Sequence, residues 1–418
     1  MSVEARPGYK QTEVGVIPED WEVNQLDTLG VGSVPPIKAG PFGSSLTKDT
    51  YVASGFKVYG QEQVIRGDYL FGDYFISLKK YRELESCAVH PGDVLLSLVG
   101  TAGKLLVVPI DAPAGVINPR LIRFSFDKKR VSPLFFKDLF EAGQVQSLLA
   151  RYAQGGTMGV LNAGMLRMVN IPLPSLAEQE AIAEALSDAD TLIESLEQLV
   201  AKKRHLKQGT MQELLTGKKR LSGFSGDWEV KRLGDVVDQF VGGGTPSRSN
   251  PAYWGEEIPW VTVKDFATFN PRSSQESITR TGLHNSASHL IPRGTLITST
   301  RMALGKAVIY EVDVAINQDL KALFLKSILD TRYLCFWFQY HGQSINDLGS
   351  GSTVKGISLP DLRKIEFQLP SVSEQTAIAT ILSDMDTEIA ELETQLTKTR
   401  ALKQGMMHKL LTGEIRLI

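Results

Sequence analysis

The chain has 418 residues, of which 42% are hydrophobic and 22% are charged. This is ordinary globular composition, which excludes collagen-like, low-complexity and wholly disordered chains and predicts two to four domains. Lys and Arg total 45 against 47 Asp and Glu, a balance that argues mildly against a dedicated nucleic-acid binder. Any DNA binding must therefore use local basic loops or share the phosphate contacts with a partner.

The lack of targeting signals and the small number of cysteines predict a cytoplasmic protein. No apolar run approaches the ~18 residues of a membrane span, and the first ten residues lack the apolar core of a signal peptide. Cys87 and Cys335 are far apart and are not in a metal-binding spacing. We expect both to be buried free thiols in a reducing compartment.

The first globular part reads as a compact mixed α/β domain with mainly antiparallel sheet and long loops. Strand-like runs lie at 93–99, 105–108 and 121–126, and a helical pattern covers 132–153. Its loops combine glycine with basic and hydroxyl side chains, which suit contacts to phosphate and to base edges. The candidate DNA-binding residues of this part are Lys38, Ser44, Ser45, Lys48, Lys79, Lys80, Arg82 and Lys104.

A helix of about 40 residues follows. Ser175 and Glu178 form the spacing of a capping box, and no proline interrupts the pattern before Gly217, which suits a C′ position. Apolar residues alternate at spacings of four and three, as in a coiled-coil seam: Ile182, Leu186, Ala189, Ile193, Leu196 and Val200. Further leucines widen the apolar stripe and predict a partner surface: Leu192, Leu199, Leu206, Leu214 and Leu215.

The second globular part repeats the pattern of the first. Strand-like runs lie at 295–299 and 307–310, and a helical pattern covers 328–346. Its candidate DNA-binding residues are Thr245, Ser247, Arg248, Asn250, Tyr253, Lys264, Arg301, Lys306 and Lys355.

The end of the chain repeats the first long helix. Residues 173–217 recur as 369–413 without a gap, and Ser371, Glu374 and Gly413 repeat the helix signals. The second seam is Ile378, Leu382, Met385, Ile389, Leu392 and Leu396. Because neither globular part could cover so long a helix, we expect the two helices to pack on each other, antiparallel. The corresponding partner-surface leucines are Leu402, Leu410 and Leu411.

Catalytic and metal motifs are absent from the sequence. Residues 238–244, DQFVGGG, fit the D-x-F-x-G-x-G loop with which amino-methyltransferases hold S-adenosylmethionine, but the matching Asn/Asp-Pro-Pro-aromatic motif is missing. Residues 100–104 lack the spacing of a P-loop, and the six histidines show no zinc spacing. The sequence therefore predicts a non-catalytic adaptor that binds no metal.

With this order of units, the chain resembles the specificity (S) subunit of type I restriction–modification systems over essentially its full length. The resemblance rests on the two-fold repeat and on phrases at 9–23, 243–254, 258–261, 173–179 and 369–375, with the LKQGxM and LLTG endings of both helices. It implies a fold of two pseudo-symmetric α/β target-recognition domains separated by two long antiparallel coiled-coil helices. The expected segments are 1–172 and 222–368 for the recognition domains, and 173–221 and 369–418 for the helical regions.

The resemblance also implies the function. Each recognition domain would read one half of a bipartite, asymmetric site in double-stranded DNA, while the helices set the spacing and dock two methylation subunits. Those partners would carry S-adenosylmethionine, and restriction subunits joined through them would use ATP and Mg²⁺, so this chain would bind no cofactor. Two alternatives remain open: a free-standing DNA adenine methyltransferase that uses the DQFVGGG loop, and a coiled-coil scaffold that does not bind DNA. The sequence does not give the DNA site, the spacer length or the host, and it leaves open whether a restriction subunit exists.

Overall fold

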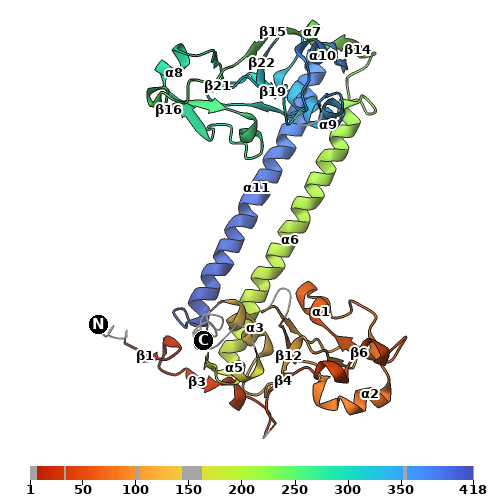
Figure 1. Cartoon of the computed structure of the whole chain (residues 1–418), viewed down its shortest axis with the longest axis vertical. Coiled ribbons are helices and arrows are strands. Elements are labelled where there is room, and N and C mark those ends of the chain that lie inside the picture. The colour runs from red at the N-terminus through yellow and green to blue at the C-terminus, as the bar shows by residue number, and fades with distance from the viewer. Residues whose placement is uncertain (1–6, 33, 99–102, 144–161, 352–354, 418) are drawn as a thin grey trace. The chain divides into compact units, whose positions relative to one another are not determined.

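A computed structural model describes residues 7–32, 34–98, 103–143, 162–351 and 355–417 (Figure 1). The chain forms two compact units, Met1–Leu196 with Gln395–Ile418, and Glu197–Thr394. Each unit therefore contains one globular part and one half of each long helix.

The described residues of the first unit form two larger sheets and two strand pairs. A four-stranded antiparallel sheet has the order β10-β9-β12-β4, and a five-stranded sheet has the order β5-β7-β6-β11-β8 with β6 and β11 parallel. The strands predicted at 93–99, 105–108 and 121–126 are β9, β10 and β12. The bounds are β4 Ile37–Ala39, β5 Tyr51–Val52, β6 Phe56–Tyr59, β7 Phe75–Ile76, β8 Ala88–Val89, β9 Val94–Ser97, β10 Leu105–Val107, β11 Gly115–Ile117 and β12 Leu121–Phe124.

Short helices and paired strands complete the first unit. The helix predicted at 132–153 is α3 as far as residue 141, and its remainder from 144 onward lies outside the described residues. The helices are α1 Gln61–Arg66, α2 Leu78–Glu83, α3 Pro133–Glu141 and α5 Ala163–Arg167, with 3₁₀ turns η1 Leu26–Thr28, η2 Gly43–Ser45, η3 Lys48–Thr50 and η4 Glu85–Cys87. The remaining strands are β1 Tyr9–Thr12, paired with β2 Gly15–Pro18, and β3 Glu22–Gln25, paired with β13 Asn170–Leu173.

The second unit has the same plan. Its two four-stranded sheets have the orders β15-β22-β19-β20 and β17-β16-β21-β18, with β16 and β21 parallel. The strands predicted at 295–299 and 307–310 and the helix predicted at 328–346 are β19, β20 and α9. The strands are β14 Glu229–Arg232, β15 Val237–Gly242, β16 Trp254–Val261, β17 Glu276–Ile278, β18 Leu290–Ile291, β19 Leu296–Ser299, β20 Ala307–Ile309, β21 Val314–Ile316, β22 Leu320–Leu325 and β23 Glu366–Leu369.

The helices of this unit occupy comparable places. They are α7 Leu233–Val236, α8 Arg280–His284, α9 Thr331–Asp347 and α10 Leu359–Lys364, with 3₁₀ turns η5 Pro251–Tyr253 and η6 Val263–Phe266. Helix α9 is amphipathic and places Tyr333, Leu334 and Phe338 in the core beneath β19 and β22. Cys335 is buried here and Cys87 is buried in the first unit, both as free thiols, as predicted.

Two helices of 40 residues each, α6 Leu176–Leu215 and α11 Val372–Leu411, confirm the predicted lengths. The serine Oγ atoms before each helix accept hydrogen bonds from Glu178 N and Glu374 N, both at 3.3 Å. Gly217 and Gly413 follow the helices with φ of 68° and 69°, the left-handed conformation expected of C′ glycines.

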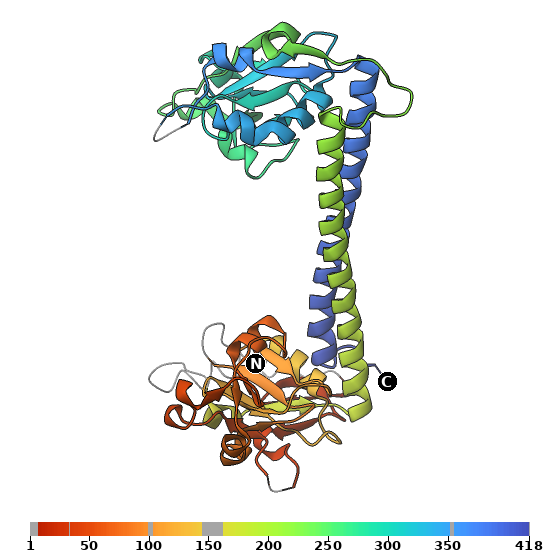
Figure 2. The same ribbon diagram turned by 90° about the vertical axis from the view of Figure 1, so that its right-hand side faces the viewer.

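The two helices run antiparallel in both units, side by side in Figure 2. In the first unit Lys403 Nζ lies 2.6 Å from the Asp190 carboxylate, and in the second Lys207 Nζ lies 2.5 Å from Asp386 Oδ1. Residues of both predicted seams are buried or half-buried along the pair, including Leu196 and Leu396. The antiparallel coiled-coil prediction is therefore confirmed within each unit.

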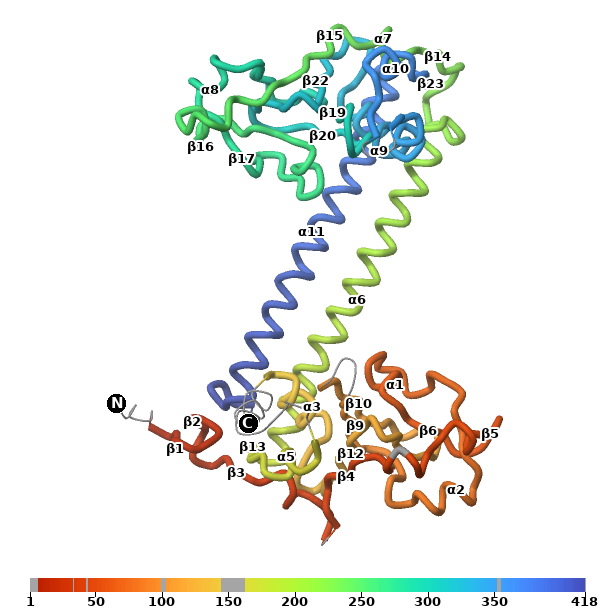
Figure 3. Tube along the Cα trace, in the orientation of Figure 1, coloured from red at the N-terminus to blue at the C-terminus, as the bar shows by residue number. Residues whose placement is uncertain are grey.

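The carboxylates of the predicted capping boxes have a different role from the one expected. Glu178 Oε2 accepts a hydrogen bond from Trp21 Nε1 at 3.1 Å and another from Arg416 Nη2 at 2.8 Å. The glutamates were expected to bond back to their own helix starts, so that half of the prediction is wrong. Figure 3 shows the last turns of α11 beside the β1–β2 hairpin, where Tyr9 Oη donates to the Gly413 carbonyl at 2.9 Å.

The second unit repeats this anchor. Trp228 Nε1 donates to Glu374 Oε2 at 3.1 Å, and Arg220 Nη2 donates to the same oxygen at 2.7 Å. Both glutamates are almost fully buried. A buried carboxylate is tolerated only when it is paired and hydrogen-bonded, and here an indole and a guanidinium meet that need.

Four of the leucines predicted to bind a partner belong to the chain's own cores. Leu410 and Leu411 pack in the core of the first unit, and Leu214 and Leu215 pack in that of the second, all at most 4% exposed. The prediction is wrong for these four. The last turn of each helix is covered by the unit that it enters, and this accounts for the surplus of apolar residues there.

Candidate nucleic-acid interface

The two units can be compared position by position through their hydrogen-bond registers. Ser97 on β9 lies opposite Leu121 on β12, and Ser299 on β19 lies opposite Leu320 on β22. We call residues in the same register equivalent. Arg120, just before Leu121, is therefore equivalent to Asp319, just before Leu320.

Three loops meet at one corner of the first unit: the loop after β4, the start of α1 and the turn between β11 and β12. Asn118 N donates to the Tyr59 carbonyl at 2.8 Å, which joins the turn to the end of β6. A Cβ on Gly40 would lie 1.9 Å from the Asn118 carbonyl oxygen, so only glycine allows the first loop to approach this closely. We call this meeting of loops the corner of the first unit.

The second unit has the equivalent corner. Asn317 N donates to the Val261 carbonyl at 3.0 Å, and Thr245 Oγ1 donates to Gln318 Oε1 at 2.7 Å. A Cβ on Gly243 would lie 1.7 Å from the Ile316 carbonyl oxygen. The same backbone frame therefore presents different side chains in the two units.

This packing also explains the DQFVGGG segment. Gly242 ends strand β15, and Gly243 is pressed against the β21 backbone. The Gly244 carbonyl accepts hydrogen bonds from Trp260 Nε1 at 3.0 Å and from Ser288 Oγ at 2.7 Å. These glycines allow the loop to pack closely against the sheet. That structural role gives the methyltransferase alternative no support.

The residues predicted to bind DNA in the first unit lie on several elements. Lys38 is half-buried on β4, and Lys80 on α2 forms an ion pair with Glu83 at 3.0 Å. The other six lie in or beside η2, η3, α2 and β10, and all but the half-buried Ser45 are exposed: Ser44, Ser45, Lys48, Lys79, Arg82 and Lys104. Of these eight residues, only Lys48 lines a cleft that lies in the corner of the first unit.

In the second unit the predicted residues include several with structural partners. Asn250 Oδ1 accepts from Ala252 N at 3.1 Å and caps η5, which contains Tyr253. Ser247 Oγ lies 2.8 Å from Ser249 Oγ. Lys264 is exposed at the start of η6.

Arg248 is the most constrained of these residues. Its guanidinium lies 3.7 Å from the centroid of the Trp254 ring and donates to Glu276 Oε2 at 2.8 Å. The paired Arg248 guanidinium holds the pKa of Glu276 below its usual value. The charge is thus fixed in position on an aromatic face, where a cation–π contact stabilises it.

The structure brings Arg301 and Lys355 together. Met302 N donates to the Lys355 carbonyl at 2.9 Å, and Arg301 forms an isolated β-bridge with Gly356. Met302 and Ala303 have φ of 59° and 37°, a left-handed conformation that is uncommon for residues other than glycine and often marks functional turns. Arg301 Nη1 lies 4.0 Å from Asp319 Oδ1, so this turn reaches the corner of the second unit.

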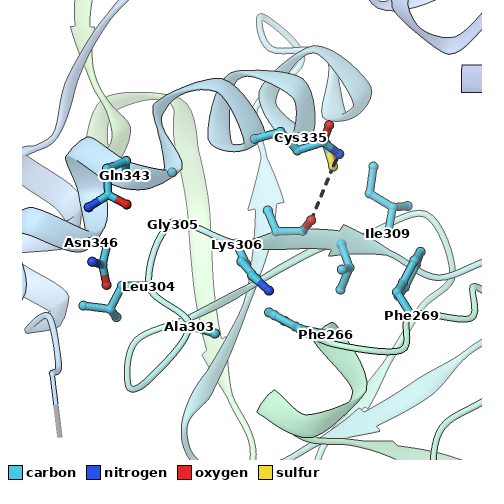
Figure 4. A pocket seen from close by; sticks show the side chains of 14 residues that line it. Phe266, Phe269, Ala303, Leu304, Gly305, Lys306, Ile309, Cys335, Gln343 and Asn346 are labelled. Carbon is cyan, nitrogen blue, oxygen red and sulfur yellow. Dashed lines mark hydrogen bonds between the residues drawn. The ribbon is translucent and has the colours of Figure 1, made fainter. Parts of the chain in front are cut away.

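Lys306 lies at a separate pocket of about 760 Å³ between the 301–306 turn and α9 (Figure 4). Apolar side chains line much of it, among them Phe266, Phe269 and Leu304. The Cys335 thiol donates to the Ala307 carbonyl at 3.7 Å, and burial raises the pKa of Cys335 to about 11. This thiol therefore stays protonated at neutral pH and is not a reactive nucleophile.

The sequence analysis missed the cleft in the corner of the first unit. It has a volume of about 760 Å³, and its lining includes Tyr51, Gln61, Tyr74 and Arg120. These are the side-chain types that contact base edges and stack on bases, but they come from four segments. The only local signal in the sequence is the Asn118-Pro119-Arg120 segment, which does not by itself indicate DNA binding.

The remaining predicted partner residues stay on the surface of the long helices. Leu192, Leu199, Leu206 and Leu402 are between 38% and 64% exposed. Leu192 and Leu199 each directly precede a residue of the seam, so these leucines flank the seam and leave an apolar surface that another molecule can contact.

Comparisons with known proteins agree with this architecture. A family model described as "Type I restriction modification DNA specificity domain" matches residues 18–202 and 225–399, once for each repeat. The chain belongs to this family. The specificity subunit of the putative type I restriction enzyme MjaX from Methanocaldococcus jannaschii is 25% identical over 98% of this chain and 97% of its own length.

Further relatives carry the same description. The specificity subunit of type I restriction enzyme EcoR124I/EcoR124II from Escherichia coli is 28% identical over 44% of this chain and 47% of its own length. The crystal structure of the HsdS subunit from Thermoanaerobacter tengcongensis matches 96% of this chain and 98% of its own, with a TM-score of 0.52 and 18% identity. At that identity the structural match shows the shared fold of two pseudo-symmetric α/β domains and two long helices.

Two kinds of feature are absent from the described part of the chain. No helix there is long and apolar enough to cross a membrane. Among the same residues, no group of three or more His, Cys, Asp or Glu side chains is placed to hold a metal ion.

Proposed function

We propose that this chain is the DNA-specificity subunit of a type I restriction–modification complex and that each unit reads one half of a bipartite, asymmetric DNA site. The observation that carries the proposal is the repeated corner, in which one backbone frame presents different side chains in the two units. A repeated frame with divergent side chains suits a protein that reads two different sequences in one manner. The recognition domains would be 1–172 and 222–368, joined to helical regions 173–221 and 369–418.

Phosphate contacts in this proposal come from positions at which both units carry the same charge. Lys104 and Lys306 directly precede β10 and β20 in equivalent register, and both are exposed. Since phosphate is the same in every DNA sequence, a contact to it should retain a cation in both units. The other residues predicted from the sequence remain proposed DNA contacts. Among them, Arg248 would present its positive charge in a fixed position rather than on a mobile side chain.

The chain itself would catalyse nothing and bind no cofactor. We propose that two methylation subunits dock along α6 and α11, on the surfaces marked by Leu192, Leu199, Leu206 and Leu402. S-adenosylmethionine would be bound by these partners, and ATP and Mg²⁺ by restriction subunits joined through them. The repeat of the helices supports two copies of one partner, and a cytoplasmic location in a prokaryote follows from such a complex.

Methylated-adenine mapping tests this proposal. Cells that carry the gene with its methylation subunit should show a bipartite methylated motif that disappears when this gene alone is deleted. The substitutions Lys104→Ala and Lys306→Ala should each weaken DNA binding without altering the motif and lower the dependence of log affinity on log salt by about one contact. An isolated chain that binds labelled S-adenosylmethionine would favour the methyltransferase alternative, and a complex without sequence-selective duplex binding would favour the scaffold.

A further inference from the structure

The cleft in the corner of the first unit contains an unsatisfied polar group. Gln61 lines the cleft, and its Oε1 is buried with no hydrogen-bond donor among the described residues. The rings of Tyr51 and Tyr74 lie 5.2 Å apart in the same lining. Buried polar atoms nearly always have a partner, so a donor brought into this cleft would supply a missing hydrogen bond.

The equivalent place in the second unit is occupied by the chain itself. Tyr51 pairs with Ile76 as Trp254 pairs with Ile278, which makes Tyr51 and Trp254 equivalent. In the second unit, the planar guanidinium of Arg248 stacks on Trp254. The frame thus accommodates a planar, hydrogen-bonding group against an aromatic ring, and in the first unit the equivalent Tyr51 lines the cleft.

Arg120 is fixed at the cleft by its backbone. Its N–H donates to Asn118 Oδ1 at 2.9 Å, and its carbonyl accepts from Leu98 N at 3.0 Å. The Arg120 side chain is exposed, and its guanidinium makes no hydrogen bond or ion pair to any of the described residues. Burial raises the pKa of Tyr51, and the nearby Arg120 charge opposes that rise, which places the two groups in one electrostatic environment.

The repeat distinguishes a base contact from a phosphate contact at this position. Arg120 is equivalent to Asp319, a reversal of charge, whereas Lys104 and Lys306 keep the same charge. A phosphate contact would favour a cation in both units, because phosphate does not vary with sequence. A base contact would differ between two domains that read different sequences.

We propose that Arg120 is a specificity-determining residue that reads a guanine in the major groove of the half-site bound by the first unit. Guanine presents O6 and N7 as two acceptors, which a guanidinium matches with two parallel hydrogen bonds. The amide of Gln61 and the Tyr51 and Tyr74 rings line the space beside it. This inference rests on the proposed function.

The test uses the full chain assembled with its methylation subunit. Methylated-adenine maps are compared for the wild type, Arg120→Ala, Arg120→Lys and Arg301→Ala, with Lys129→Ala as an exposed first-unit control outside the cleft lining. Arg120→Ala should lower the preference for guanine about tenfold or more at one position of one half-site and leave the other half-site unchanged. Arg120→Lys should retain part of the preference, and Lys129→Ala should leave the motif as in the wild type.

Three results would overturn the role of Arg120 while leaving the proposed function intact. They are a wild-type half-site without a G·C pair at any specified position, an unchanged motif in Arg120→Ala, and a uniform loss of methylation with the motif retained, which would indicate a phosphate contact. Arg120→Ala and Arg301→Ala must also affect different half-sites, because they lie in different units. Absence of any bipartite motif in the wild type would instead refute the proposed function and this inference with it.

Discussion

Arg416, close to the C-terminus, bridges the carboxylates of Asp20 and Glu178, with its Nη2 atom 2.7 Å from Asp20 Oδ2 and 2.8 Å from Glu178 Oε2. These contacts join the end of α11 to the start of α6 and to the segment before β3. They also raise the pKa of Arg416, so the guanidinium remains charged at every accessible pH.

Loss of this bridge should destabilise the first unit. In Arg416→Met, the nearly buried Glu178 carboxylate keeps only the Trp21 indole, and we expect a cost of about 1–3 kcal/mol because Arg416 itself is partly exposed. Urea unfolding should give this loss, and Glu178→Gln should cost much less in the Arg416→Met background than in the wild type. Additive effects of the two substitutions would show that the residues are not coupled.

The buried and exposed leucines of α6 should respond differently to charge. Leu215→Asp places an unpaired carboxylate in the core of the second unit and should cost more than about 3 kcal/mol, visible as loss of cooperative thermal unfolding. The exposed Leu206→Asp should leave the melting temperature within a few degrees and reduce co-purification with the methylation subunit. Equal loss of fold in both variants would contradict the assignment of Leu206 to the surface.

The two C′ glycines form a matched pair. Each has a left-handed φ, so an alanine at either position should cost about 1 kcal/mol in backbone strain. A Cβ on Gly413 would also lie 2.4 Å from Pro18 Cγ, whereas on Gly217 its nearest neighbour is a Trp228 ring atom at 3.5 Å. Denaturant titrations should therefore show a larger loss for Gly413→Ala than for Gly217→Ala, and the reverse order would refute the close contact.

Asp138 predicts a pH dependence. Burial raises its pKa from 3.8 to about 6, so the folded first unit binds a proton that the unfolded chain releases between these values. Stability from this residue is present below pH 4 and is lost as the pH rises through 6. Since one pKa unit corresponds to about 1.4 kcal/mol, Asp138→Asn should raise the free energy of unfolding at pH 8 by about 2–3 kcal/mol and have little effect at pH 4. An equal gain at both pH values would exclude this origin.

Local signals in the sequence predicted the elements well. The helix lengths, the C′ glycines, the seam and the strands around 94–97 and 296–299 follow from periodicity and from residues near in sequence. The role of Glu178 was missed because its partners, Trp21 and Arg416, are distant in the chain. A capping-box pattern carries no information about such partners.

The sequence predicted what kind of loops would form the candidate site but not which residues line it. The sequence predicted that basic and polar loops contact DNA. Arg120 and Lys79 are both basic and both exposed, so neither composition nor exposure distinguishes one from the other. The hydrogen-bond registers of the two sheets, which the sequence does not contain, identify which equivalent positions keep a charge and which reverse it. The prediction that the leucines near the helix ends bind a partner was wrong for a related reason. A sequence shows an apolar stripe on a helix but not which part of the chain covers it.

Membership of Gln395–Ile418 in the same unit as Met1–Leu196 has a consequence for biosynthesis. On the ribosome, the amino-terminal half emerges first yet lacks Leu410, Leu411 and Arg416 until residues 395–418 have been synthesised, so its core stays open. The intervening half is contiguous and can finish folding earlier. A nascent chain that stops before Gln395 would thus carry a folded second unit and an incomplete first unit, which would be a target for cellular proteases.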